Sequence, residues 1–117
     1  MFTVYGIPNC NTVKKARTWL EQNNIEYTFH DYKKKGITSE KIQEWFKKYP
    51  WEKLVNKAGT TWKALSEEEK ALVINEESAI DLMIKKTSVI KRPVIEDAAG
   101  KAIALGFSEK EFEEVFL

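Results

Sequence analysis

The fold is decided by the stretch Val4-Tyr5-Gly6-Ile7-Pro8-Asn9-Cys10-Asn11-Thr12-Val13 near the N-terminus. The apolar, β-prone run from residue 2 to residue 7 predicts a strand, which Gly6 and Pro8 break. The asparagines and the threonine after the break favour the start of a helix. Cys10, the one cysteine of the chain, is therefore expected at a helix N-terminus.

This position favours a reactive thiol. Unpaired backbone N–H groups and the positive end of the helix dipole stabilise a thiolate, and Lys14 and Lys15 add positive charge about one turn away. Such settings lower a thiol pKa below its ordinary value of about 8.5. The alternative is an inert cysteine that packs as a small hydrophobe. Because Cys10 lies between two asparagines in a strand-to-helix turn, where function concentrates, reactivity is the favoured interpretation.

Length and composition indicate one folded domain. A chain of 117 residues with 43% hydrophobic and 12% aromatic residues can bury a core. The net charge of +1 provides no global field for nucleic acid or a membrane. One cysteine cannot form an internal disulfide, so a redox cycle needs a second thiol from outside the chain. No apolar run reaches membrane-spanning length and the first strand begins at once, which predicts a cytoplasmic protein.

The order of predicted elements is that of an α/β protein. Strand, helix and strand with short joins make a right-handed βαβ unit with parallel strands. A block of helices and loops follows, and then an antiparallel hairpin and a last helix that carries Val115 and Phe116 inward. The predicted elements are a strand at 2–7, a helix at 11–23, a strand at 25–32, a helical insertion at about 38–87, strands at 92–96 and 101–105, and a helix from 108. This layout is that of a thioredoxin-like fold, in a single domain of residues 1–117.

Two polar features near the second strand are interpreted as structural. His30, the one histidine, falls within the strand, and strand alternation places it with Thr28 and Tyr32 on one face. A histidine packed beneath helices is favoured over a catalytic base. The run Lys33-Lys34-Lys35-Gly36 predicts a solvated turn.

Three segments share features with a known family. They read YGIPNCNTVKKA at 5–16, NKAGTTW at 56–62 and IKRPV at 90–94. Together they resemble the arsenate-reductase-like (ArsC) family, in the Spx/MgsR-related branch that includes YffB proteins, and the resemblance covers the whole chain in order. It implies that Pro93 is cis and faces Cys10, and that Arg92 lies beside the thiol. Without it, Arg92 would be a surface charge beside a strand and Pro93 an ordinary trans proline.

The resemblance also implies which residues form the site. Cys10 and Arg92 are the expected catalytic residues, and no metal is expected. An arginine beside a thiolate lowers its pKa and can hold a carboxylate or oxyanion with two hydrogen bonds. The expected substrate-binding residues are Asn9, Asn11, Thr12, Lys63, Arg92 and Pro93.

One departure from the relatives determines the expected chemistry. Many thioredoxin-like proteins and Spx-type regulators have a second cysteine three residues after the first, and here that residue is Val13. The expected function is therefore a glutathione-dependent thiol reductase with a single nucleophile. Cys10 attacks a mixed disulfide or oxidised acceptor, and external glutathione resolves the adduct. Glutathione is a co-substrate, no cofactor is tightly bound, and glutaredoxin is a further candidate partner.

Three other functions remain open. The chain could be an Spx-like redox-responsive regulator that binds RNA polymerase, or a binding module whose cysteine is inert. It could also be a true arsenate reductase, but relatives with that activity group three arginines around the cysteine. Here only Arg92 carries over, Lys63 occupies the second position, and residues 104–108 contain no basic side chain.

Overall fold

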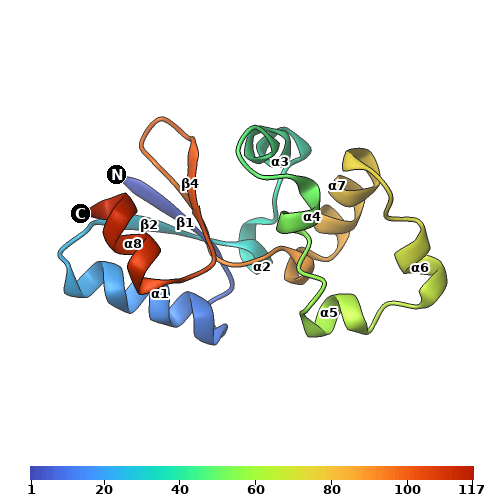
Figure 1. The fold of residues 1–117 in the computed structure, drawn as a ribbon, viewed down its shortest axis with the longest axis horizontal. Coiled ribbons are helices and arrows are strands. Elements are labelled where there is room, and N and C mark those ends of the chain that lie inside the picture. The colour runs from blue at the N-terminus through green and yellow to red at the C-terminus, as the bar shows by residue number, and fades with distance from the viewer. The chain divides into compact units, whose positions relative to one another are not determined.

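A four-stranded sheet forms the centre of one of the two compact units in the computed structural model, which describes residues 1–117 (Figure 1). This unit comprises residues 1–35 and 92–117. The strand order is β2-β1-β3-β4; β1 and β2 are parallel, and β3 is antiparallel to both β1 and β4. The strands are β1 (Phe2–Gly6), β2 (Tyr27–Asp31), β3 (Val94–Glu96) and β4 (Ala102–Leu105). The predicted βαβ unit, hairpin and thioredoxin-like fold are confirmed.

Two helices cover one face of this sheet and form its core. They are α1 (Asn11–Gln22) and α8 (Glu109–Phe116). One apolar face of α1 is buried, and the ring of Trp19 meets that of Phe112 edge-on at 5.3 Å. Of the two α8 residues expected to point inward, Phe116 packs against the core, whereas Val115 is exposed. The buried cluster consists of Val4, Ala16, Trp19, Leu20, Ile95, Ala104 and Phe112.

The opposite face of the sheet carries a group of polar and aromatic side chains. Tyr5 and His30 are paired in register, and their rings lie 4.6 Å apart. The Tyr5 hydroxyl donates a hydrogen bond to Oε1 of Glu96 at 3.0 Å. Glu96 is the one charged residue that is fully buried. His30 is half-buried and packs against the Tyr5 and Tyr32 rings, on the face opposite α1 and α8, not beneath those helices.

Segments that are distant in the sequence meet at one end of the sheet, where β1 and β2 end and β3 begins. The register pairs Gly6 with Asp31 and Tyr5 with Val94. The C-terminal ends of β1 and β2 therefore lie beside the N-terminal end of β3. As a result, the residues that follow β1 and β2 are neighbours of the residues that precede β3.

The chain after β2 differs from the sequence-based expectation. The predicted strand extends to residue 32 and the predicted turn covers the lysines, but Tyr32–Lys35 forms a short helix, α2. Tyr32 is buried at its first position and the three lysines are exposed. The strand thus ends one residue earlier than predicted, at Asp31.

The second unit, Gly36–Lys91, is helical and contains the predicted insertion. Thr38 caps α3, and Ser66 forms a capping box with Glu69 at the start of α6. Helix α6 ends at Ala71 and buries no residue, and Leu72 beyond it is 72% exposed. The elements are α3 (Ser39–Phe46), α4 (Trp51–Leu54), α5 (Thr60–Lys63), α6 (Glu67–Ala71), α7 (Glu76–Lys85) and the 3₁₀ helix η1 (Thr87–Val89).

Gly6 allows α1 to approach the sheet closely. A Cβ atom at Gly6 would lie 2.8 Å from Cγ2 of Val13, which is closer than carbon atoms approach one another. Val13 is fully buried on α1 and, as a β-branched residue, has little freedom to move aside. Gly6 therefore sets how near the first turn of α1 lies to the end of β1.

We expect Gly6→Ala to lower the free energy of unfolding by about 1–3 kcal/mol, because the added methyl overpacks this contact. Guanidinium denaturation measures the loss. The matched variant is Gly6→Ala/Val13→Ala, in which the clashing methyls are gone. The double variant should lose less stability than the sum of the two single changes. Additive losses would show that the two residues do not press on one another.

Candidate active site at Cys10

Cys10 stands at the N-cap position of α1, as the sequence predicts. Its backbone N–H donates to the carbonyl of Ile7 at 3.2 Å, closing the turn that follows β1. Its backbone is extended, with φ −89° and ψ 127°, and its carbonyl accepts the first helical bond, from Lys14 N at 3.0 Å. The side chain is partly exposed, so a reagent in solution can reach the sulfur.

The surroundings of the sulfur favour the thiolate. The side chain makes no capping hydrogen bond as a neutral thiol, but a deprotonated sulfur is a strong acceptor. Burial alone would raise the pKa of Cys10. Hydrogen bonds from the backbone N–H groups of Val13 and Thr12, and a hydrogen bond and the positive charge from Arg92, act in the opposite direction. They outweigh burial, so the pKa of Cys10 lies below its ordinary value.

Arg92 is the charged side chain that the fold brings to the sulfur. It immediately precedes β3, at the end of the sheet where β1 also ends. Its peptide bond to Pro93 is cis, as the resemblance implies. The guanidinium is always charged and presents several N–H donors in one plane. It can therefore bond the sulfur and still donate to a carboxylate or another anion beside it.

Two contributions to the acidity of Cys10 differ from the sequence-based expectation. The Val13 N–H has the largest lowering effect, although in the sequence Val13 stands out only as the residue where many relatives have a second cysteine. Lys14 and Lys15, expected to help, are not among the groups that lower the pKa. Both lysines are exposed, where water weakens the field of a charge. Contact with a helix N–H thus matters more here than charge a turn away.

The other predicted site residues occupy different environments. Asn9, Asn11 and Thr12 flank Cys10 and are exposed, so their polar side chains are available to a ligand of the thiol. Pro93 is buried, and its carbonyl accepts a hydrogen bond from Gly106 N at 2.8 Å. Lys63 is exposed on α5 in the helical unit, and its part in the site stays a prediction.

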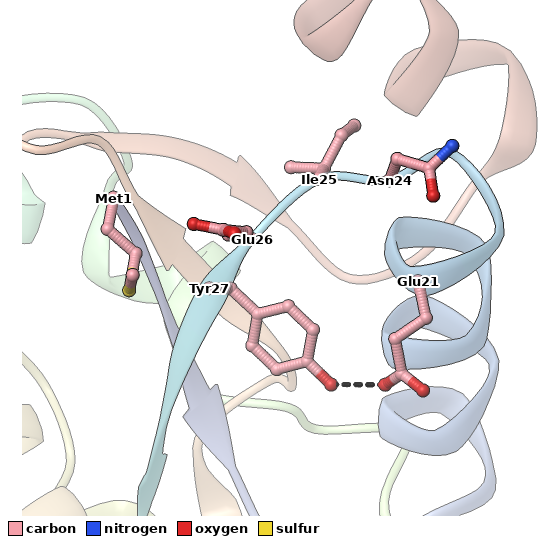
Figure 2. Close-up of a pocket in the computed structure, with 6 residues that line it drawn as sticks. All are labelled: Met1, Glu21, Asn24, Ile25, Glu26 and Tyr27. Carbon is pink, nitrogen blue, oxygen red and sulfur yellow. Dashed lines mark hydrogen bonds between the residues drawn. The ribbon is translucent and has the colours of Figure 1, made fainter.

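A concave region lies at the other end of the sheet, where β1 and β2 begin. Figure 2 shows the Tyr27 side chain at the start of β2 pointing toward Glu21 of α1, to which its hydroxyl donates a hydrogen bond. The same hydroxyl accepts a hydrogen bond from Nε of Arg17 at 2.9 Å. These groups join α1 to β2. The region is lined by Met1, Glu21, Asn24, Ile25, Glu26 and Tyr27.

No group of three or more histidine, cysteine, aspartate or glutamate side chains is arranged to hold a metal ion. None of the helices has the length and apolar character needed to cross a bilayer.

Comparison with known proteins identifies the relatives of this chain. Residues 5–115 match the ArsC family. The chain is 39% identical to the solved YffB protein over the full length of both chains, with a TM-score of 0.91. It is 46% identical to an arsenate reductase (ArsC) related protein from Brucella melitensis, covering 98% of this chain and 93% of that one, with a TM-score of 0.76. The global transcriptional regulator Spx 1 of Lactococcus lactis is 26% identical over 95% of this chain and 85% of its own length.

We expect Arg92→Met to raise the pKa of Cys10, because the variant removes both a hydrogen bond and a positive charge from the thiolate while keeping a side chain of similar length. The rate of alkylation by iodoacetamide, followed against pH, measures the change. Lys14→Met and Lys15→Met are the matched controls and should leave the midpoint in place. A shift in the lysine variants as large as that in Arg92→Met would show that general charge, not contact, sets the acidity.

Proposed function

The chain belongs to the ArsC family, and from this premise we propose that it is a glutathione-dependent thiol reductase with one nucleophilic cysteine, Cys10. The observation that carries the proposal is a partly exposed thiol whose pKa is lowered at a helix N-terminus and by Arg92. A lowered thiol pKa raises the fraction of thiolate at neutral pH, and the thiolate is the form that attacks disulfides.

The proposed reaction has two exchange steps. In the first, the Cys10 thiolate attacks the glutathione sulfur of a mixed disulfide, a new S–S bond forms, and the substrate leaves as a thiolate. In the second, a glutathione thiolate attacks the glutathione sulfur of the adduct. Oxidised glutathione forms and the Cys10 thiolate is released. Two electrons thus pass from glutathione to the substrate, and the protein ends as it began.

The need for an external thiol follows from the position of Val13. This residue is fully buried and fills the place three residues after Cys10 where a resolving cysteine would stand. Because the chain has one cysteine, the adduct cannot be resolved within the molecule. Glutathione fits the second step because it supplies a thiol together with carboxylates that the Arg92 guanidinium can bind with two hydrogen bonds.

A second candidate is a redox-responsive transcriptional regulator that binds RNA polymerase. It is supported by the similarity to Spx 1 over nearly the whole chain. Val13 weighs against an Spx-like switch, since a disulfide between two cysteines of the same chain cannot form. A regulator would bind RNA polymerase according to its oxidation state and would show no turnover with glutathione.

We expect Cys10→Ser to abolish covalent cycling without changing the fold, because serine occupies the same space but is a poor nucleophile at neutral pH. Intact-mass measurement after treatment with oxidised glutathione should show one added glutathione on the native protein and none on the variant. Reduced glutathione should then remove the adduct. A thermal melt of the variant controls for folding. Turnover retained in Cys10→Ser would exclude Cys10 as the nucleophile.

Arsenate is a poorer fit to this site than a glutathione disulfide. A multiply charged oxyanion has to approach a thiolate that repels it, so the site needs several positive donors. In the sheet unit, Arg92 supplies such a contact, whereas residues 104–108, which comprise the end of β4 and the turn after it, contain no basic side chain. Lys63 is the remaining candidate for a positive donor to the oxyanion, but an ammonium group offers a point charge instead of the planar pair of donors of an arginine.

We therefore expect arsenate reduction to be slow compared with formation of the glutathione adduct on the same preparation. One lost charge-assisted hydrogen bond costs about 1.5–3 kcal/mol, which is roughly a 10- to 150-fold loss in rate or affinity. Steady-state assays with arsenate, glutathione and glutaredoxin measure the first activity, and the rate of adduct formation measures the second. Efficient arsenate turnover would contradict the assignment and favour a true arsenate reductase.

A further inference from the structure

Tyr32 carries a polar group that the fold leaves unsatisfied. Its side chain is 2% exposed, and its hydroxyl makes no hydrogen bond. A buried polar group without a partner lowers stability, so such groups are rare in folded proteins, and functional sites are one of the places where they persist. Tyr32 therefore needs an explanation that packing alone does not supply.

The position of Tyr32 links it to the proposed site. It follows β2 directly, at the end of the sheet where β1 ends and β3 begins. Its ring lies 6.3 Å from that of Tyr5 and 6.0 Å from that of His30. The positive charge of Arg92 acts on the Tyr32 hydroxyl in the direction opposite to burial, so the guanidinium lies within electrostatic range of it. Arg92, which precedes β3 at the same end of the sheet, thus acts on both Tyr32 and Cys10.

Tyr5 offers a direct contrast in the same region. Its hydroxyl is also in the interior but donates a hydrogen bond to Glu96 at 3.0 Å. Burial, followed by the negative charge of Glu96 and this hydrogen bond, raises the pKa of Tyr5. Burial likewise raises the pKa of Tyr32 well above its ordinary value, so its hydroxyl keeps its proton at neutral pH. The two tyrosines differ in that one hydroxyl has a partner and the other has none.

We propose that Tyr32 is a positioning residue for Arg92, whose guanidinium donates an N–H to the Tyr32 hydroxyl oxygen when it turns to bind the carboxylate of a disulfide substrate. The guanidinium is planar and has several donors, so it can bond the sulfur, a carboxylate and a third acceptor together. With the Tyr32 hydroxyl as the third acceptor, the orientation of the guanidinium plane is fixed. This inference deepens the proposed function and rests on it for the identity of the substrate.

The role predicts a selective effect on reagents that carry a carboxylate. An uncharged reagent does not use the guanidinium as a binding group, so its reaction with the thiolate does not depend on how the plane is oriented. A carboxylate reagent does depend on it. Glutathione disulfide and 2-hydroxyethyl disulfide form one such charged and uncharged pair. Iodoacetate and iodoacetamide form a second pair that reports on the site without requiring any reductase activity.

The test compares Tyr32→Phe with Tyr5→Phe, each of which removes one hydroxyl from a neighbouring ring. Rate constants for all four reagents are measured and corrected for the thiolate fraction of each variant. In Tyr32→Phe the reactions with iodoacetate and glutathione disulfide should slow by roughly 3- to 10-fold, the range of a single hydrogen bond, and the uncharged reagents should change less than about twofold. The melting temperature should not fall, because an unsatisfied hydroxyl is removed. Tyr5→Phe should show the opposite pattern, with a lower melting temperature and unchanged selectivity.

The same measurements in an Arg92→Met background separate positioning from packing. There Tyr32→Phe should have no further effect on either charged reagent. Equal slowing of charged and uncharged reagents, unchanged rates in Tyr32→Phe, or an effect that persists in Arg92→Met would each overturn the proposal. If the native protein forms no adduct with glutathione disulfide, the proposed function fails, and the iodoacetate pair alone still decides the role of Tyr32.

Discussion

The hydrogen bond and charge contact between Arg92 and the Cys10 sulfur is the interaction on which the chemistry of this protein depends. The two residues are far apart in the sequence and meet only because β3 pairs with β1 in antiparallel register. That pairing is stabilised by the core on one face of the sheet, where aromatic side chains of α1 and α8 pack against each other. The hydrophobic core therefore affects the acidity of the thiol without touching it, because it keeps the first turn of α1 and the start of β3 side by side.

Part of this arrangement follows from local sequence, and part does not. The place of Cys10 is predictable because Gly6, Pro8 and the flanking asparagines restrict the backbone to a strand, a turn and a helix start. The largest contribution to the acidity of Cys10 is not predictable from local sequence, because Val13 acts through its backbone N–H, which no side-chain pattern reveals. Pairing with Arg92 requires knowledge of long-range strand order, which the family resemblance supplied and residue spacing alone would not have.

Tyr32 illustrates the limit of pattern-based inference more sharply. Its aromatic side chain fits a strand, and alternation extends the strand to it, but the chain turns into α2 at that residue. The missing partner of its hydroxyl is invisible in a sequence, because it depends on what every neighbouring element presents. Lysines 33–35 form a short helix, not a turn, for a similar reason: a four-residue helix has too few residues to show a periodic pattern.

The N-cap position of Cys10 reverses a common use of cysteine chemistry. Thiol labelling usually reports unfolding, because a buried cysteine reacts when the protein opens. Here the folded state is the one with the lowered pKa, since unfolding removes the helix N–H groups and Arg92 from the sulfur. At a pH at or below the folded pKa of Cys10, the gain in thiolate exceeds the loss in nucleophilicity that accompanies it. At such a pH the native molecule is labelled faster than the denatured one, and by linkage its stability rises with pH from the folded pKa of Cys10 up to the unfolded one. A decline in labelling rate, not a rise, marks the loss of the native state.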